Sequence, residues 1–181
     1  MTKFYTGVGD SGKTAIGGRK LSKGELIFEA VGDIDELNSV IGIIMSRVEN
    51  GTIKEVLSVV QNRLFGIGAE IAATIDPMFK PKRLVSGDDT KALERYIAEL
   101  SNGLGEIREF VLPGGTGGAE FLDLGRAVAR RAERSVVRLG AITSLDPGIV
   151  TYLNRLSSLL FVAARRVNID SGFKEKHPDY S

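Results

Sequence analysis

Apolar residues recur every three to four positions through most of the chain after residue 32, and this helical periodicity restricts the fold more than any other feature. Asp33 and Asp146 stand where N-caps are expected, and Pro147 follows the second of them at a first helical position. The sequence therefore predicts an all-α five-helix bundle with short connections. The expected helices cover residues 33–49, residues from about 52 to a stop at Pro77, residues 87–101, residues 119–139 and a last stretch starting at 146–147.

The chain has 181 residues, which suits one domain with a sizeable core. We expect three parts within this single domain. Residues 1–32 are rich in glycine and predicted to be irregular, residues 33–169 form the bundle, and residues 170–181 form a polar tail.

Composition excludes several classes of function. The chain has no cysteine, which removes disulfides, thiol catalysis and cysteine metal sites. Its one histidine, His177, lies in the tail, where we expect solvent around it, so no dedicated metal site is predicted. The net charge of +1 favours neither nucleic acid nor an acidic membrane as a partner. No apolar signal core or membrane-length apolar run is present, so we expect a soluble, cytoplasmic protein.

The stretch GVGDSGKT at residues 7–14 fits the P-loop pattern G-x-x-x-x-G-K-[ST]. That pattern binds phosphates only between a buried strand and the N-terminus of a helix. Here only six residues precede it, and Gly17 and Gly18 follow it, at a cost of about 2 kcal/mol to a helix relative to two alanines. A conventional P-loop is therefore not expected.

The stretch LGRAVARRAERSVVRL at residues 124–139 carries five arginines and one glutamate. At about 100° per residue, Arg126, Arg130 and Glu133 fall on one side of the helix, within roughly 60° of each other. One interpretation is a solvated face with an Arg130–Glu133 pair. The other is an anion site, because guanidinium groups bind phosphate oxygens through two hydrogen bonds.

The last expected helix places Asn154, Ser158 and Arg165 on one side, opposite much of its apolar stripe. Asparagine is unfavourable inside a helix, which draws attention to Asn154. It is either an amide bonded to backbone within the core or a ligand for a base, a ribose or a neighbouring loop.

Five segments together resemble the PduO-type ATP:cob(I)alamin adenosyltransferases, in the order and spacing of that family. This resemblance implies a five-helix bundle that assembles as a homotrimer with active sites between subunits. It also implies a reductase and an adenosylcobalamin-dependent enzyme as partners. The segments are YTGVGDSGKTAIGG, FEAVGDIDELNSVIG, EFVLPGGTGGAE, RAVARRAERSVV and YLNRLSSLLFVAARR.

The resemblance implies that the glycine-rich N-terminal segment binds ATP phosphates as an irregular loop. Glycines allow close backbone approach, successive N–H groups can form an anion nest, and Lys13 and Thr14 add a charge and a hydroxyl. By matching positions, the implied ATP-binding residues are Thr6, Gly9, Asp10, Gly12, Lys13, Thr14, Lys23, Arg130, Glu133, Arg134 and Asn154.

On the corrin side, the resemblance implies that Asp35 pairs with Arg126 across the subunit interface and that Phe110 crowds the lower face of the corrin. The residues alone also allow Phe110 to be a core anchor. Two positions depart from the family pattern: Gly7 stands where lysine is usual, and Asp123 stands where histidine is common.

The implied reaction transfers the 5′-deoxyadenosyl group of ATP, bound with Mg²⁺, to the cobalt of cobalamin and releases triphosphate. Two alternatives remain open at the level of sequence. One is a non-catalytic, ATP-sensing helical protein that regulates a partner, and the other is a conventional P-loop NTPase.

Overall fold

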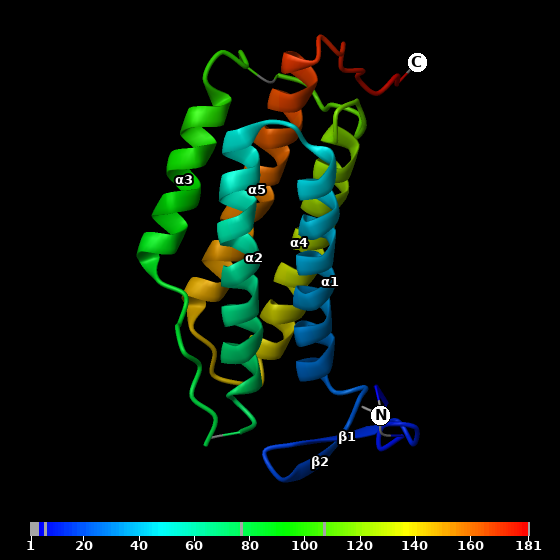
Figure 1. Ribbon diagram of the computed structural model, residues 1–181, viewed down its shortest axis with the longest axis vertical. Helices are drawn as coiled ribbons and strands as arrows, with labels where there is room; N and C mark the ends of the chain where they lie inside the picture. Colours follow the sequence, from blue (N-terminus) through cyan, green and yellow to red (C-terminus); the bar gives the residue numbers. More distant parts are fainter. Residues whose placement is uncertain (1–3, 6, 77, 107, 181) are drawn as a thin grey trace.

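The computed structural model describes residues 4–5, 7–76, 78–106 and 108–180. This part of the chain forms a helical bundle with a small two-stranded sheet at one end (Figure 1). Successive helices of the bundle run up and down its long axis, and α3 packs along α5. The elements are β1 Lys13–Ile16, β2 Arg19–Ser22, α1 Leu26–Arg47, α2 Gly51–Ala72, α3 Gly87–Ser101, α4 Ala119–Gly140 and α5 Pro147–Asp170.

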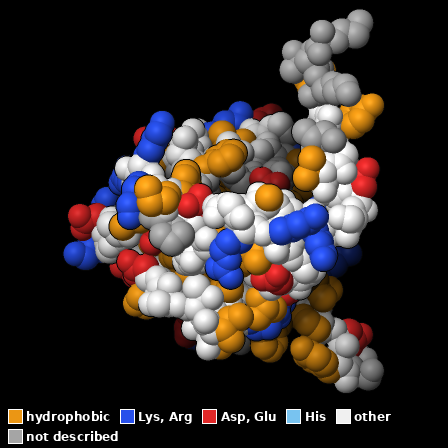
Figure 2. Space-filling model, turned by 90° about the horizontal axis from the view of Figure 1, so that it is seen from below, with side chains coloured by type: hydrophobic (Ala, Val, Ile, Leu, Met, Phe, Trp, Pro, Cys, Tyr) orange, Lys and Arg blue, Asp and Glu red, His pale blue; other side chains and the backbone are white. Residues whose placement is uncertain are grey.

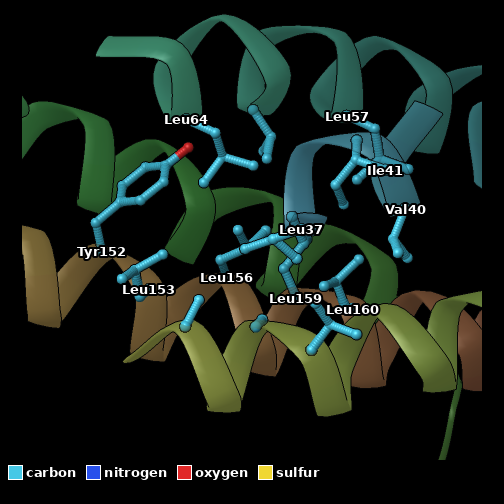
Figure 3. Packing of buried hydrophobic residues seen from close by; sticks show 14 of the residues in the cluster. Leu37, Val40, Ile41, Leu57, Leu64, Tyr152, Leu153, Leu156, Leu159 and Leu160 are labelled. Carbon is cyan, nitrogen blue, oxygen red and sulfur yellow. The ribbon is translucent and has the colours of Figure 1, made fainter. Parts of the chain in front are cut away.

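The apolar stripes of the helices meet in one continuous core. Leu37 and Ile41 of α1, Leu64 of α2 and Leu156 and Leu160 of α5 are all fully buried and face one another (Figure 3). Burying each side chain of this size stabilises the fold by about 1.5–3 kcal/mol. The predicted all-α five-helix bundle is confirmed, with the addition of the small sheet. No described helix combines the length and hydropathy that a membrane crossing requires.

Three of the predicted helices have nearly the expected bounds. The third covers Gly87–Ser101 and the fourth covers Ala119–Gly140. The last begins at Pro147, and the side chain of Asp146 accepts a hydrogen bond from the Gly148 amide at 2.7 Å, as expected for its N-cap. The second begins at Gly51, capped by Asn50, and already ends at Ala72.

The prediction for the first helix was wrong at its start. Helix α1 begins at Leu26, so Asp33 lies inside the helix and does not cap it. The apolar stripe continues backwards through Ile27 and Ala30, both buried, and Gly32 does not interrupt it. Packing of these residues outweighs the unfavourable helix propensity of one glycine. The glycine-rich segment consequently ends earlier than residue 32.

That segment is also more regular than predicted. Strands β1 and β2 form an antiparallel hairpin in which Lys13 pairs with Ser22 and Ile16 pairs with Arg19. Gly17 and Gly18 make the two-residue turn with φ of +56° and +73°, a conformation that glycine adopts readily. The sequence analysis treated these two glycines only as helix breakers and so missed the hairpin.

The hairpin extends from the end of the bundle where α1 begins (Figure 1). All eight strand residues are exposed or half-buried, so little of the hairpin is covered by its own bundle. Seen from this end, Lys and Arg side chains lie in several separate groups among acidic and hydrophobic ones (Figure 2). An isolated hairpin is marginally stable in water, which suggests that further contacts support it.

The opposite end of the bundle carries the connection from α3 to α4 and the tail that follows α5 (Figure 1). Arg165 was expected on the side of the last helix opposite much of its apolar stripe. This expectation is wrong, because the Arg165 side chain is only 2% exposed. It forms ion pairs with Asp123 at 2.7 Å and with Glu175 at 2.5 Å. A buried guanidinium requires such partners, since an unpaired buried charge costs several kcal/mol.

Gly118, the residue before α4, offers a test of how this end is packed. Its φ is +95°, and a Cβ there would lie 2.9 Å from Val48 Cγ1 and 3.1 Å from the Val48 backbone nitrogen. We expect Gly118→Ala to lower the free energy of unfolding by about 1–3 kcal/mol in urea denaturation, because backbone strain and a clash combine. Gly140→Ala, where a Cβ meets open space, should change it by less than about 1 kcal/mol. Equal effects of the two substitutions would contradict this account.

Candidate functional site

Helices α4 and α5 together present a polar surface that contains four of the predicted ATP-binding residues. Asn154 is half-buried, and its Nδ2 donates to Glu133 Oε1 at 3.0 Å. Arg155 Nη1 in turn donates to Asn154 Oδ1, also at 3.0 Å. The Asn154 side chain is thus bonded to other side chains, whereas the core alternative required bonds to backbone. Glu133 bonds to Asn154 and does not pair with Arg130. One N–H of the Asn154 amide is left over by these two bonds.

Four of the five arginines of α4 divide into two groups. Arg131 pairs with Glu36 and lies 3.4 Å from Asp33, and Arg138 pairs with Glu29, so both are tied to α1. The hydrogen bond to Glu36 raises the pKa of Arg131 further. These two arginines therefore fit the interpretation of a solvated, salt-bridged face.

Arg130 and Arg134 form the second group. Both are exposed, and neither lies within 4.0 Å of a carboxylate oxygen of the described residues. Two cations one helical turn apart repel each other unless an anion lies near both. The geometry therefore fits the anion-site interpretation at Arg130 and Arg134, and not at Arg131 and Arg138.

The predicted phosphate segment forms tight turns that lead into the hairpin. Asp10 N–H donates to Gly7 O at 3.2 Å, and Gly12 N–H donates to Gly9 O at 3.1 Å. No helix follows these turns, since β1 begins at Lys13, and this confirms that GVGDSGKT is not a conventional P-loop. Thr6 lies outside the described residues.

Lys23, which directly follows strand β2, lies against this segment. Its backbone N–H donates to Gly12 O at 2.9 Å, and its ammonium nitrogen lies 2.6 Å from the place that a Cβ on Gly9 would occupy. The antiparallel register also brings Lys13 next to Ser22, one residue from Lys23. The hairpin thus gathers two lysines and a glycine turn, the elements of an anion site, at one end of its ladder.

A hollow of about 430 Å³ lies at the opposite end of the bundle, within the size range of ligand pockets. Phe110 lines this hollow and is 80% exposed, which contradicts the core-anchor alternative. Arg126 lines the same hollow, and its Nε is buried without a hydrogen-bond partner in the described chain. The full lining is Arg108, Glu109, Phe110, Val111, Arg126 and Phe161.

Asp35 lies elsewhere, in a mainly apolar hollow between α1 and α2 that includes Phe28, Leu64 and Phe65. The three residues predicted for the corrin side are therefore only partly brought together. Phe110 and Arg126 share one hollow, and Asp35 faces another, so the predicted Asp35–Arg126 pair is not formed within one chain.

Sequence reasoning missed Phe161, which lines the hollow beside Phe110 and Arg126. The signal was available, because Phe161 lies three residues after Ser158 and four before Arg165 on the side of α5 that had been singled out. In the described part of the chain, no three His, Asp or Glu side chains converge as a metal site would require.

A sequence model of the cobalamin adenosyltransferase family matches residues 4–167, which is most of the chain. The chain belongs to this family. A cobalamin adenosyltransferase of Cupriavidus metallidurans is 37% identical over 174 residues, covering 95% of this chain and 91% of the relative. A corrinoid adenosyltransferase of Citrobacter freundii is 34% identical over 166 residues, covering 91% and 94%.

A solved relative extends the likeness to three dimensions. It is a variant PduO-type ATP:corrinoid adenosyltransferase from Lactobacillus reuteri, complexed with cobalamin and ATP. It is 31% identical, covers 97% of this chain and 99% of its own, and superposes with a TM-score of 0.88. The family resemblance inferred from the five sequence segments is thereby confirmed.

Proposed function

We propose that this protein transfers the 5′-deoxyadenosyl group of ATP to the cobalt of cob(I)alamin, producing adenosylcobalamin and inorganic triphosphate. The observation that carries the proposal is the likeness, along almost the entire chain, to an adenosyltransferase that was solved with both cobalamin and ATP. The curated relatives are transferases, which disfavours the alternative of a non-catalytic ATP sensor.

Chemically, the Co(I) ion is the nucleophile. A Co–C5′ bond forms while the C5′–O bond breaks, and the bonding electron pair leaves with triphosphate. The protein therefore supplies no general base. It has to align C5′ with cobalt and stabilise the charge of the departing triphosphate.

The anion-binding groups of the hairpin and of α4 suit the second task. Lys13 and Lys23, together with backbone N–H groups of the turns at residues 7–12, would hold phosphate oxygens at one end. Arg130 and Arg134 would hold them from the helix, because neither has a carboxylate partner in the described chain. Mg²⁺ bound to the phosphates would neutralise further charge.

The remaining ATP contact is assigned to Asn154. Glu133 and Arg155 hold the nitrogen and the oxygen of the Asn154 amide. The remaining N–H is therefore already oriented, and little side-chain entropy of Asn154 is lost when a ligand binds. We assign this group to the adenosine part of ATP.

The corrin side is assigned to the hollow that Phe110 and Arg126 share. Phe110 would crowd the lower face of the corrin and displace the lower ligand of Co(II), which makes the metal easier to reduce. Reduction needs an electron donor, so a reductase in the cytoplasm is the expected partner, and an adenosylcobalamin-dependent enzyme would take the product.

A homotrimer would complete the site. Asp35 and Arg126 line different hollows of one chain, and Arg126 Nε is buried without a partner there. The hairpin is scarcely covered by its own bundle. These three features are explained if the hairpin and Asp35 of one subunit meet Arg126 of the next.

The reaction itself is tested by incubating the protein with ATP, Mg²⁺ and chemically reduced cobalamin. The adenosylcobalamin spectrum and triphosphate should appear together. Release of phosphate or ADP without a new corrinoid spectrum would reject the proposal.

Replacing Lys13 or Arg130 by alanine should weaken ATP binding or slow transfer by roughly 1–3 kcal/mol each, the range for losing a charge-assisted hydrogen bond. Thermal stability without ligand should barely change. Arg138→Ala is the matched control on the same helix, since Arg138 already pairs with Glu29, and it should leave ATP kinetics unaltered. If Arg138→Ala and Arg130→Ala lowered the rate equally, the anion site would be misplaced.

Light scattering at micromolar concentration should report a mass three times that of the 19.5 kDa chain, because the site is incomplete without neighbouring copies. A monomeric mass would refute the shared site.

Phe110→Ala should leave ATP affinity within a few-fold, because none of the residues assigned to ATP lines the hollow that Phe110 shares with Arg126. It should severely slow adenosylation that starts from cob(II)alamin under a mild reductant. Much of the rate should return when cobalt is supplied as Co(I), which keeps no lower ligand. Equal losses in the two regimes would mean that Phe110 positions the corrin or supports the fold in general.

A further inference from the structure

The tail after α5 lies against the segment that carries Phe110. The Leu112 amide donates a hydrogen bond to Lys176 O at 2.8 Å. His177 Nδ1 lies 2.9 Å from Phe110 O, at hydrogen-bonding distance, and 3.6 Å from Glu109 Oε2. The tail, expected to be solvated, thus holds the backbone on both sides of Val111.

Glu175 anchors this tail in the interior. Its carboxylate lies 2.5 Å from Arg165 Nε and accepts a hydrogen bond from Asn168 Nδ2 at 2.8 Å. Arg165 and Asn168 are themselves buried. A carboxylate that pairs with a buried guanidinium and accepts a hydrogen bond from a buried amide is costly to withdraw, so the tail is fixed at this point.

The same buried residues hold the chain just beyond Phe110. Gly114 N–H donates to Asp123 Oδ2 at 3.0 Å, and Gly114 O accepts from Asn168 Nδ2 at 3.1 Å. Gly115 allows this close approach, because a Cβ there would lie 1.9 Å from Asn168 Oδ1. Residues 110–114 are therefore held at one end by the tail and at the other by α4 and α5.

The network also supports the wall of the hollow. The Arg165 guanidinium stacks over the ring of Phe161, with its central carbon 5.0 Å from the ring centroid. Phe161 lines the hollow that Phe110 and Arg126 share.

Phe110 itself has no such support, because the residue is 80% exposed. The backbone fixes the Cα–Cβ direction from which the Phe110 ring extends, and the backbone here is held by His177 and by the Leu112–Lys176 bond.

We propose that residues 173–177 act as a positioning strap, in which Glu175 anchors the tail and His177 holds the Phe110 carbonyl so that the ring faces the corrin. This inference rests on the proposed function and adds to it a positioning role for the tail. His177 is a positioning residue, since it acts through Phe110 and touches neither substrate in this scheme.

The test compares three variants of the full-length protein. His177→Ala removes the contact with Phe110 O, and His177→Asn offers an amide nitrogen close to the place of Nδ1. Lys174→Ala is the control from the same tail, with an exposed side chain. His177 is exposed too, so none of the three should impair folding.

The readout is the rate of adenosylation from cob(II)alamin under a mild reductant, divided by the rate with chemically supplied Co(I). His177→Ala should lower this ratio about three- to ten-fold, the effect of losing one hydrogen bond. His177→Asn should restore most of it, and Lys174→Ala should match the wild type. Unchanged ratios for all three variants would overturn the inference.

Two further measurements separate the strap from a general structural effect. In a Phe110→Ala background, His177→Ala should lower the ratio no further, because the two residues act as one unit. If His177→Ala lowered the ratio in this background as much as in the wild type, action through Phe110 would be rejected. Hydrogen exchange without substrates should show faster exchange at the Leu112 amide in His177→Ala than in Lys174→Ala.

The exchange measurement also separates failure of this inference from failure of the proposed function. A wild-type protein that forms no adenosylcobalamin would reject the function, whereas exchange at Leu112 would still report the strap. An active wild type with identical exchange in both variants would reject the strap alone.

Discussion

The buried ion pair between Arg165 and Asp123 is the interaction on which one end of the molecule depends. Both side chains are almost fully buried, and their charges would be too costly there without each other and without Glu175. The pair joins α5 to α4, and the same carboxylate orients the loop at Gly114. Asp123 is thus the acid that organises this end of the bundle.

Much of the fold could be predicted because it follows from local patterns. The stripes of α3, α4 and α5 and the cap at Asp146 are visible in the sequence and recur in the structure. The start of α1 could not be placed, because Gly32 and Asp33 look like a helix boundary and only the packing of Ile27 and Ala30 overrides that signal. The hairpin was missed for a similar reason, since a Gly-Gly pair serves equally as a breaker and as a turn.

The site was less predictable than the fold. Periodicity placed Arg126, Arg130 and Glu133 on one side of α4, but which arginines pair with α1 depends on how two helices pack. The burial of Arg165 depends on Asp123 and Glu175, which lie 42 residues before it and 10 after it, and no local pattern links these three.

The separation of Asp35 from Arg126 has a genetic consequence. If each site takes Asp35 from one chain and Arg126 from its neighbour, two defective copies can compensate for each other. Mixed assemblies of an Asp35-defective chain and an Arg126-defective chain would place both defects in some sites and neither defect in about a quarter of them, by random association in a cyclic trimer. Two inactive alleles could then support growth together where neither does alone. Two alleles that alter Phe110 and Arg126 could not, because one chain supplies both residues to a hollow and every site would carry one of the two defects.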